Sequence, residues 1–455
     1  MINLNDFKFS KYNHKIKLNG DIYLYNALTG GFGKVEKNNI EYINNCNFNE
    51  DTIPNDIYKD EKFISSLIEG GFIVYKDLDE INLINTIHNT SRFGNKSSLG
   101  ITLLPTTNCN FRCTYCFEKY NNYPNKIMSA KIIDKTLKFI DDNLENNASL
   151  TISWFGGEPL LEFGTIKKMQ SEINNMASKR NVTVSSGIIT NGYLLTEDIS
   201  NQLVKLGITT AQITLDGSKE FHNKKRKLKN GMGTYDKIIS NILKANSNLH
   251  IPIRINIDKN NIDNMDMFLD SLKESGICDK KNVFIYFAIV RDYDTSKSCI
   301  SPNCFNVKEF SNEELKLYRL AYKKGIHNAR ISINPNIPSC GAVSPNTFVI
   351  EPDGTIQKCW NLIGNSSCAI GHLLYEENEY RKYQFLSNQY KWYSWQGYNK
   401  DECKNCNILP LCMGGCPYYD IFEKELFVNN NYSCSTLKYN LDETLKSLAC
   451  EKINK

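Results

Sequence analysis

Apolar residues between positions 100 and 290 fall into short runs separated by amphipathic stretches. β-Branched and aromatic residues dominate six of these runs, at 101–105, 150–155, 182–190, 209–215, 251–257 and 283–290. The first stretch between them places apolar side chains at helical spacing, at Ile133, Leu137, Ile140 and Leu144. Near-continuous apolar strands that alternate with helices indicate a parallel sheet covered by helices. We therefore expect an α/β fold, an incomplete (β/α)6 TIM barrel over residues 100–330.

Residues 1–95 have a different pattern, typical of a small separate unit. The run 22–28 predicts a strand, and an amphipathic helix ends at Gly70–Gly71 before a strand over 72–75. A helix that ends at glycine and leads into a strand suits a winged-helix-like module. The polar stretch 86–98 contains Gly and Ser, and we interpret it as a linker.

The periodicity changes again after about residue 330. The segment 340–450 shows little helical periodicity before 435–450, yet it holds nine of the sixteen cysteines. Short apolar runs with so many potential ligands indicate that bound metal helps to stabilise this part. We therefore expect a cysteine-rich domain over residues 335–455.

Length and charge narrow the class of protein. A chain of 455 residues suggests about three domains. Lys+Arg 54 against Asp+Glu 50 gives no support for a nucleic-acid partner, and we interpret the basic run 224–229 as a solvated helix end or loop. No secretory signal pattern or apolar run near the roughly 18 residues of a membrane span is present. We expect a cytoplasmic protein with no membrane partner, whose cysteines are metal ligands rather than disulfides.

Three cysteines follow the first predicted strand with the spacing C-x3-C-x2-C, namely Cys109, Cys113 and Cys116. Parallel β/α folds place their chemistry at the carboxyl ends of the strands. Each iron of a cubic four-iron, four-sulfur cluster takes one terminal ligand, so three thiolates leave one iron open to bind a small molecule. A structural zinc site completed by a distant residue is the alternative.

The end of the second predicted strand carries a second motif, Gly-Gly-Glu-Pro, formed by Gly156, Gly157, Glu158 and Pro159. The glycines allow close approach of the backbone to a ligand, and the turn presents carbonyls and Glu158 at the sheet edge. With both motifs on consecutive strand ends, the sequence resembles the radical S-adenosylmethionine (SAM) superfamily. The resemblance implies that the open iron chelates SAM, that the Gly-Gly-Glu-Pro backbone holds its ammonium group, and that SAM is cleaved to a 5′-deoxyadenosyl radical.

Further SAM contacts are implied by the same resemblance. Thr190 and Asn191 lie where the family contacts the ribose, and Tyr115 lies where it has an aromatic beside the adenine, although packing alone would also explain an aromatic there. The stretch 213–226 resembles the pattern S-L-D-G…H-D…R, with Thr214 in place of Ser. Arg226 is then a candidate for a bidentate pair with the SAM carboxylate.

Two other positions in that stretch carry less weight. Asn223 replaces the Asp of the family pattern. His222 is better explained as a packed or hydrogen-bonding residue than as a catalyst.

The C-terminal cysteines resemble the seven-cysteine SPASM domain in every spacing. Cys340, Gly354 and Cys359 form C-x13-G-x4-C, and a C-x2-C-x5-C-x3-C stretch and a last cysteine follow, at Cys403, Cys406, Cys412, Cys416 and Cys434. The resemblance implies two auxiliary four-iron, four-sulfur clusters, which makes three clusters in all. It assigns Cys340, Cys359 and Cys416 to the first, and the second takes the other four, Cys403, Cys406, Cys412 and Cys434. A zinc ribbon is the alternative.

The first auxiliary set is one ligand short. Some SPASM proteins carry an eighth cysteine where Asn334 stands here. Cys299, Cys304 or Cys368 is a candidate for the missing ligand, or the iron is open to substrate.

SPASM enzymes commonly modify peptides, so the resemblance implies a maturase of a ribosomally synthesised, cysteine-containing precursor peptide, with flavodoxin or ferredoxin as electron donor. Residues 1–95 then resemble a leader-binding domain that captures the leader as an added strand; a plain capping domain is the alternative. We expect thioether formation, as in sactipeptide and ranthipeptide maturases, and leave carbon–carbon crosslinking and epimerisation open. An anaerobic sulfatase-maturating enzyme has the same core but usually lacks so long a front module. A tRNA modifier normally carries a basic RNA-binding appendage, and the near-neutral charge of this chain argues against one. An electron carrier would not need an open iron.

Overall fold

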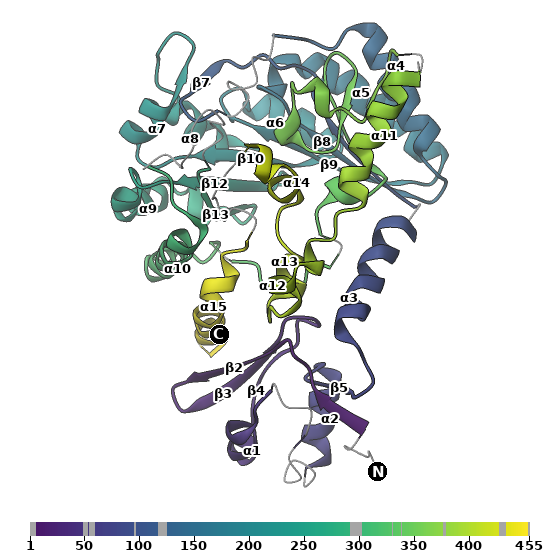
Figure 1. Cartoon of the computed structure of the whole chain (residues 1–455). Coiled ribbons are helices and arrows are strands. Elements are labelled where there is room, and N and C mark those ends of the chain that lie inside the picture. The colour runs from purple at the N-terminus through teal and green to yellow at the C-terminus, as the bar shows by residue number, and fades with distance from the viewer. Residues whose placement is uncertain are drawn as a thin grey trace.

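A computed structural model describes residues 6–48, 53, 60–94, 97–116, 125–291, 303–329, 331–337, 339–375, 379–426 and 434–453. The N-terminal module lies at one end of the molecule and the β/α barrel at the other, and C-terminal segments run beside the barrel and between the two (Figure 1). No helix in these described ranges is both long and apolar enough to cross a membrane.

The barrel is built on a sheet whose strand order is β13-β12-β10-β9-β8-β6-β14-β15-β16. Its six barrel strands are parallel: β6 (Ser98–Leu103), β8 (Ser149–Trp154), β9 (Thr183–Thr190), β10 (Ile208–Leu215), β12 (Ile251–Ile257) and β13 (Val283–Ile289). They coincide with the six predicted runs, so the α/β fold and the partial barrel are confirmed. The apolar side chains of these strands form most of one continuous core.

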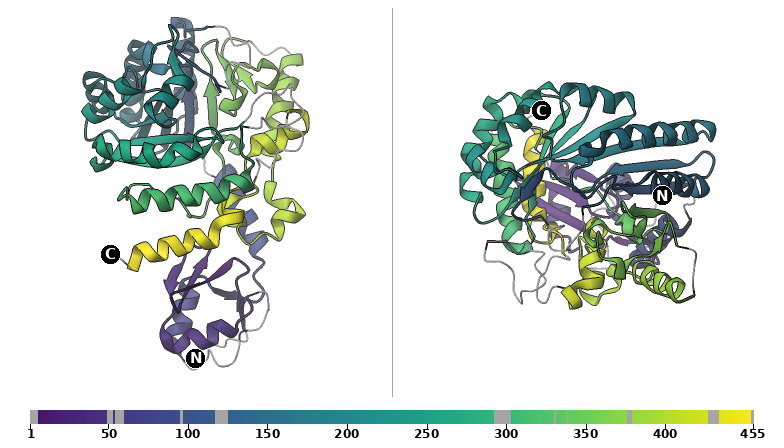
Figure 2. Two further views of the ribbon diagram at one scale, coloured as in Figure 1. Left: turned by 90° about the vertical axis from the view of Figure 1, so that its left-hand side faces the viewer. Right: turned by 90° about the horizontal axis from the view of Figure 1, so that it is seen from above.

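Helices cover the outer face of the barrel (Figure 2): α4 (Ala130–Asn143), α5 (Phe163–Lys179), α6 (Glu197–Lys205), α7 (Lys219–Lys225), α8 (Tyr235–Lys244), α9 (Met265–Glu274) and α10 (Val307–Lys323). In α4, Ile133 and Ile140 are buried and Leu137 packs against the core, which confirms the predicted stripe. Ser129 begins this helix, because its side chain accepts a hydrogen bond from the Ile132 amide.

The C-terminal part extends the barrel sheet. β14 (Thr347–Ile350) pairs in parallel with β6, and β15 (Thr355–Gln357) and β16 (Gly371–His372) follow antiparallel. The helices here are α11 (Glu379–Tyr393), α12 (Asp401–Lys404), α13 (Leu409–Cys412), α14 (Pro417–Leu426) and α15 (Leu437–Ile453). The expectation of little helix before 435 is therefore wrong. α11 and α14 bury Trp392, Tyr419 and even Asn388, so their inner faces do not follow an aliphatic periodicity.

The N-terminal module contains the antiparallel sheet β2-β3-β4 (Asn13–Leu18, Asp21–Asn26 and Phe32–Lys34) and the pair β1-β5 (Phe7–Phe9 and Ile73–Tyr75). The predicted strand at 22–28 and the helix, Gly-Gly and strand succession are confirmed, with α2 at Glu61–Glu69. Apolar side chains of α1 (Ile40–Asn45) and α2 pack with one face of the sheet. The other face, with Ile16 and Tyr25, packs with residues of α15, which lies between the module and the barrel (Figure 2).

Residues 86–94 of the segment interpreted as a linker are helical, which corrects the prediction for that part of 86–98. α3 (Glu80–Asn89) begins at the capping residue Asp79 and continues into a π-helical turn, Thr90–Gly94. His88 and Arg92 are buried although they are polar. The partners that bury them belong to the C-terminal domain, hundreds of residues away, so the local sequence shows only their polarity.

Candidate active site

The cluster loop, residues 104–116, leaves the carboxyl end of β6. Its short strand β7 (Phe111–Cys113) pairs antiparallel with β11 (Arg226–Leu228), so Cys113 lies opposite Arg226. The prediction of a solvated helix end or loop for the basic run 224–229 holds in part, because Lys224 and Lys225 end α7 and Lys224, Lys227 and Lys229 are exposed. It is wrong for Arg226, which is buried in β11. The run holds the cluster loop in place.

Cys109, Cys113 and Cys116 lie close enough to influence one another electrostatically. Burial raises the pKa of the Cys109 thiol to about 12, and burial also raises the pKa of Cys113. A buried thiol loses its proton readily only where a cation compensates the thiolate, and bound iron is such a cation. The three thiols thus suit an iron–sulfur cluster, and their role as its ligands stays a prediction.

The Gly-Gly-Glu-Pro turn packs directly against the cluster loop. A Cβ on Gly156, whose φ is +118°, would lie 2.3 Å from the Thr106 carbonyl oxygen, and one on Gly157 would lie 2.4 Å from that of Asn108. The Glu158 amide donates to the Asn108 carbonyl at 2.8 Å. The close approach that requires these glycines is therefore to the backbone just before Cys109, whereas the sequence suggested only an approach to a ligand.

Glu158 orders the ends of two neighbouring strands from inside the protein. Its carboxylate is fully buried and accepts hydrogen bonds from Thr190 Oγ1 at 2.7 Å, the Asn191 amide at 2.7 Å and the Leu160 amide at 3.1 Å. Burial raises the pKa of Glu158, and these donors oppose that shift. Asn191 in turn donates from Nδ2 to Asn110 Oδ1 in the cluster loop at 2.7 Å.

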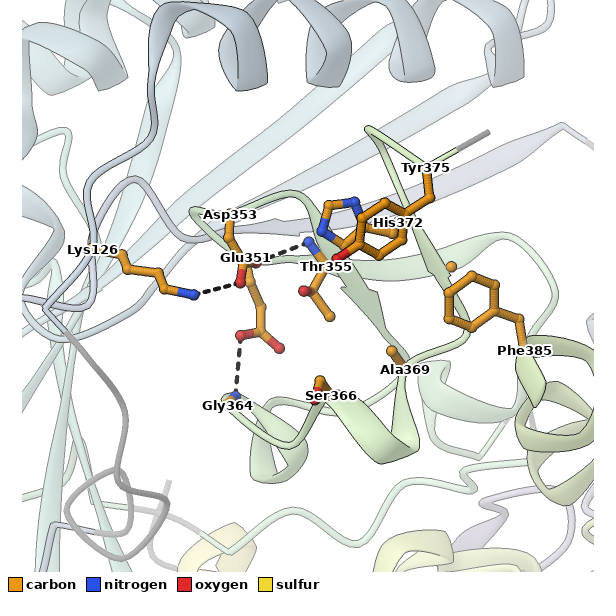
Figure 3. Close-up of a pocket in the computed structure, with 11 residues that line it drawn as sticks. Lys126, Glu351, Asp353, Thr355, Gly364, Ser366, Ala369, His372, Tyr375 and Phe385 are labelled. Carbon is orange, nitrogen blue, oxygen red and sulfur yellow. Dashed lines mark hydrogen bonds and ion pairs between the residues drawn. The ribbon is translucent and has the colours of Figure 1, made fainter. Parts of the chain in front are cut away.

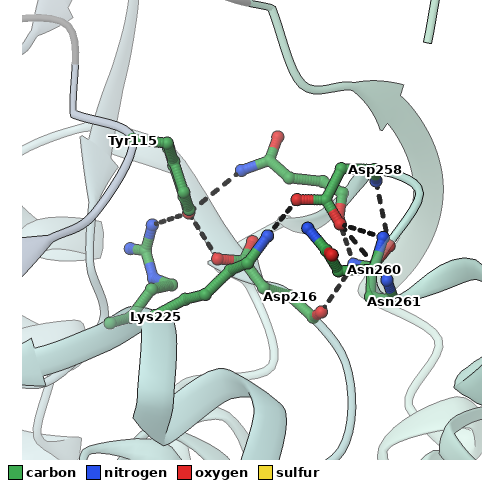
Figure 4. Close-up of polar contacts among 8 residues, drawn as sticks. Tyr115, Asp216, Lys225, Asp258, Asn260 and Asn261 are labelled. Carbon is green, nitrogen blue, oxygen red and sulfur yellow. Dashed lines mark hydrogen bonds and ion pairs between the residues drawn. The ribbon is translucent and has the colours of Figure 1, made fainter. Parts of the chain in front are cut away.

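Tyr115 connects the cluster loop to two barrel strands (Figure 4). Its hydroxyl donates to Asp216 Oδ2 at 2.5 Å and accepts from Arg226 Nη1 at 2.7 Å and Asn256 Nδ2 at 3.2 Å. Asp216 follows β10 and Asn256 belongs to β12, so the carboxyl ends of the strands meet at Tyr115. The predicted residues Tyr115 and Arg226 are thus brought together.

Two buried charged atoms in this network have no hydrogen-bond partner among the described residues. They are Arg226 Nε and Asp216 Oδ1. Arg226 and Asp216 attract each other electrostatically, but each keeps one buried atom without a hydrogen-bond partner. Buried polar atoms are normally hydrogen-bonded, so a free donor and a free acceptor beside the cluster loop suit a ligand that carries both kinds of group. The amino and carboxylate groups of SAM are groups of these two kinds. The residues present therefore fit the cofactor that the motifs imply.

Sequence reasoning missed a second ion pair at this site. Lys225 Nζ pairs with Asp258, a buried residue at the carboxyl end of β12. Asp258 also accepts from the amides of Asn260 and Asn261 (Figure 4). In the sequence, the polar run 258–261 directly after the fifth predicted strand could have indicated this pair.

The remaining predicted positions lie around this network. Thr214 is a half-buried residue of β10. His222 is buried, with Nε2 3.1 Å from Thr234 Oγ1 and Nδ1 3.4 Å from the Asp216 amide, which confirms the packed, hydrogen-bonding role. Asn223 Oδ1 accepts from the Thr234 and Tyr235 amides at the start of α8. The Asn223 amide oxygen therefore accepts the same two hydrogen bonds that the carboxylate of an aspartate would accept at this position.

The first auxiliary set, Cys340, Cys359 and Cys416, is gathered in space. Cys416 and Cys340 are the groups that act electrostatically on the Cys359 thiol, and burial raises the pKa of Cys359. Beside them, burial lowers the pKa of Lys358 to about 7. Of the candidates for the fourth ligand, Cys304 is buried, Cys368 is half-buried, and Cys299 lies outside the described residues.

The second auxiliary set surrounds one cavity. Its lining includes all four predicted thiols, Cys403, Cys406, Cys412 and Cys434. Burial raises the pKa of Cys412 to about 12. Over the described ranges, no three His, Cys, Asp or Glu side chains are grouped so as to hold a single metal ion. The role of the four thiols as cluster ligands stays a prediction.

A polar pocket lies between Lys126, which is bonded to the start of the cluster loop, and residues of the C-terminal part between 351 and 385 (Figure 3). Lys126 Nζ forms an ion pair with Asp353 at 2.7 Å, and the Lys126 carbonyl accepts from the Thr107 amide at 3.0 Å. His372 stacks on Tyr375 at the opposite wall, with ring centroids 3.8 Å apart. The C-terminal domain thereby holds the strand end that carries the cluster loop.

Comparison with known structures shows the fold. The sulfatase-maturating enzyme described as native anSMEcpe with bound AdoMet and Cp18Cys peptide has a TM-score of 0.60 at 21% identity, over 78% of this chain and 99% of that one. Streptococcus suis SuiB bound to precursor peptide SuiA has a TM-score of 0.50 at 14% identity, over 94% of this chain and 99% of that one.

Two curated proteins are similar in sequence. The cysteine-type anaerobic sulfatase-maturating enzyme of Clostridium novyi (strain NT) is 27% identical, over 77% of this chain and 96% of that protein. The radical SAM cyclopropyl synthase TigE of Paramaledivibacter caminithermalis is 25% identical, over 91% of this chain and 90% of that protein. The model of the radical SAM superfamily matches residues 103–274, from β6 through the cluster loop to α9. Residues 103–274 of this chain therefore form a radical SAM domain, and this family implies the use of SAM and a four-iron, four-sulfur cluster.

Proposed function

We propose that this enzyme matures a ribosomally synthesised precursor peptide by joining a cysteine sulfur to a carbon atom of the same peptide. Similar proteins modify sulfatases or are described with a precursor peptide, which supports a peptide or protein substrate. The observation that carries the proposal is an exposed strand edge in the N-terminal module, in a chain that also gathers two further thiol sets beyond the SAM site.

The exposed edge belongs to β4, which in the described part of the chain pairs only with β3. The Asn26 amide bonds to the Gly31 carbonyl and the Val35 amide to the Ile22 carbonyl. Since hydrogen bonds alternate along an antiparallel pair, the Lys34 amide points away from β3. A Cβ on Gly33 would meet no atom within 4 Å, so the face of the sheet is also uncovered at this residue. An extended leader peptide gains backbone hydrogen bonds by adding to such an edge.

SAM bound at the open iron supplies a 5′-deoxyadenosyl radical, which removes one hydrogen atom from the peptide carbon. A thioether then requires loss of the cysteine proton and transfer of one electron away from the peptide. The product is two hydrogens lighter than the precursor. A donor such as flavodoxin or ferredoxin would supply the electron that SAM cleavage consumes, and a cluster held by one of the two further thiol sets would accept the electron that the peptide releases.

The chain's own residues bind and orient the reactants in this scheme. Arg226 and Asp216 offer opposite charges to the amino-acid part of SAM, and Tyr115 holds both in place. Glu158 fixes Thr190 and Asn191 at the positions implied for the ribose.

Mass spectrometry of a peptide co-expressed with the enzyme tests this proposal. The peptide to use is a short cysteine-containing one encoded beside this gene. We expect a product two mass units lighter whose cysteine no longer reacts with iodoacetamide, and an unchanged peptide with Cys113→Ala. A lighter product whose thiol still alkylates would contradict the thioether and indicate carbon–carbon crosslinking. A peptide of unchanged mass would contradict both crosslinks.

Sulfatase maturation is the second candidate, favoured by the 27% identity over almost the full length of such an enzyme. The matches to the Clostridium novyi enzyme and to anSMEcpe leave about a fifth of this chain uncovered. The matches to TigE and SuiB cover more than nine-tenths of this chain. Incubation with a cysteine-type sulfatase peptide distinguishes the two functions. Conversion of its cysteine to formylglycine, with loss of sulfur, would favour this candidate over the crosslinking maturase.

A further inference from the structure

Two buried cations lie next to each other at the first auxiliary set, where the Lys358 ammonium acts electrostatically on the Cys340 thiol and Arg92 acts in turn on Lys358. Lys358 directly precedes Cys359, and Arg92 comes from the turn after α3; each is only 2% exposed. Lys358 Nζ donates to the backbone carbonyls of Ser344 and Thr347, the latter at 2.5 Å. Ser344 lies in the loop that leads from Cys340 to β14, and Thr347 is the first residue of β14.

Arg92 binds the same loop and the end of α11. Its Nε donates to the Val343 carbonyl at 3.0 Å, Nη2 to the Tyr393 carbonyl at 2.8 Å and Nη1 to the Trp395 carbonyl at 3.2 Å. The two positive charges thus converge on a stretch that begins at one expected cluster ligand.

Neither cation has an acidic partner within the described ranges. The groups that act electrostatically on Lys358 are the Cys340 thiol and Arg92 itself, which repels it. Lys358 also lies over the rings of Phe348 and Tyr393, at 5.1 and 5.3 Å from their centroids. Carbonyl dipoles and rings solvate a cation but do not neutralise it, and burial of an unpaired charge is costly. An anion in the adjacent thiol site would supply the missing negative charge.

We propose that Lys358 and Arg92 compensate the negative charge of the first auxiliary cluster and raise its reduction potential. The inference rests on the proposed function, in which Cys340, Cys359 and Cys416 hold that cluster. Reduction adds one negative charge to a cluster, so nearby cations stabilise its reduced form. The cluster between these cations is then the one suited to accept the electron that thioether formation releases.

A redox titration of the reconstituted full-length protein, followed by electron paramagnetic resonance without SAM or peptide, tests this inference. We expect Lys358→Met and Arg92→Met each to lower the potential of one cluster by at least 59 mV, a tenfold change in a one-electron equilibrium. The other two potentials should stay the same. Lys391→Met is the matched control, because it removes an exposed lysine of α11, and it should shift none of them.

Arg92→Met covers the case in which Lys358→Met loses the cluster or fails to fold, and its matched control is Arg92→Lys, which keeps the positive charge. Arg92→Lys should keep the wild-type potential even if it lowers the melting temperature. A lowered melting temperature with unchanged potentials in Lys358→Met and Arg92→Met would show a purely structural role and overturn the inference. Equal shifts of all three clusters would also overturn it. Since the titration contains no peptide, either result would leave the maturase proposal standing.

Discussion

Glu158 and His88 show how buried polar residues act in this protein. The Gly-Gly-Glu-Pro motif was visible in the sequence, but the three donors that surround Glu158 come from residues up to 33 positions away. His88 gave no signal, because its burial depends on distant C-terminal residues such as Tyr398, whose ring it meets edge-on at 5.1 Å. Motif spacing therefore predicted residues that the structure brings together, such as Tyr115 and Arg226, while their other partners had to be seen in the structure.

Replacement of Glu158 by glutamine should destabilise the protein. Glutamine replaces one carboxylate oxygen by NH2, and at the Oε2 position this donor would face the donating Asn191 amide. One buried unsatisfied group costs about 1–3 kcal/mol. Thermal unfolding should show a lower midpoint for Glu158→Gln. The exposed Glu172→Gln on α5 is the control, and equal midpoints for the two variants would contradict the role assigned to Glu158.

His88 should make stability depend on pH. Burial lowers the pKa of His88 to about 4, below the value of 6.5 for an exposed histidine. The unfolded chain then binds a proton between pH 6.5 and about 4 while the folded chain does not, so stability present above pH 6.5 falls as the pH drops. At pH 5 the loss is at most about 2 kcal/mol. His88→Phe should remove this part of the pH dependence in denaturant unfolding, and identical profiles would contradict it.

Helices and strands were predictable where their own side chains form the core. The six barrel strands carry apolar runs, and each was located from the sequence. The pairing of β14 with β6 joins segments far apart in the chain, and no local pattern indicates it. α3 and α11 were missed because polar and aromatic residues form much of their buried faces.

The exposed edge of β4 leads to a prediction about strand addition. Proline at position 34 would remove the amide that points away from β3 and would block an added strand, while leaving the β3 ladder intact. Lys34→Pro should weaken binding of a fluorescent leader peptide at least tenfold. Lys34→Ala is the control, because it also removes the ion pair with Asp21 but keeps the amide. Equal affinity of the two variants would contradict strand addition.

The three parts of the molecule support one another. The resemblance to the SPASM domain assigned the C-terminal cysteines to two sets, which stays a prediction. It did not indicate that the N-terminal sheet would pack against α15 or that Arg92 would bond to the loop after Cys340. Such contacts depend on complementary surfaces that one sequence does not display. The N-terminal module is therefore part of the core of this enzyme as well as a candidate for leader binding.

Deletion of residues 1–76 should expose the buried face of α15. Leu441 and Leu445 would lose their contacts with Ile16 and Tyr25, and the uncovered apolar surface should cause self-association. Size-exclusion chromatography should show oligomers or aggregates of the truncated protein. A stable monomer would indicate that the module is attached loosely.

Formation of 5′-deoxyadenosine tests most directly that three thiols hold a cluster with one iron open to SAM. Anaerobically reconstituted protein, reduced with dithionite and given SAM, should produce 5′-deoxyadenosine, and Cys113→Ala should produce none. Failure of the intact, iron-loaded protein to produce any 5′-deoxyadenosine would contradict this account.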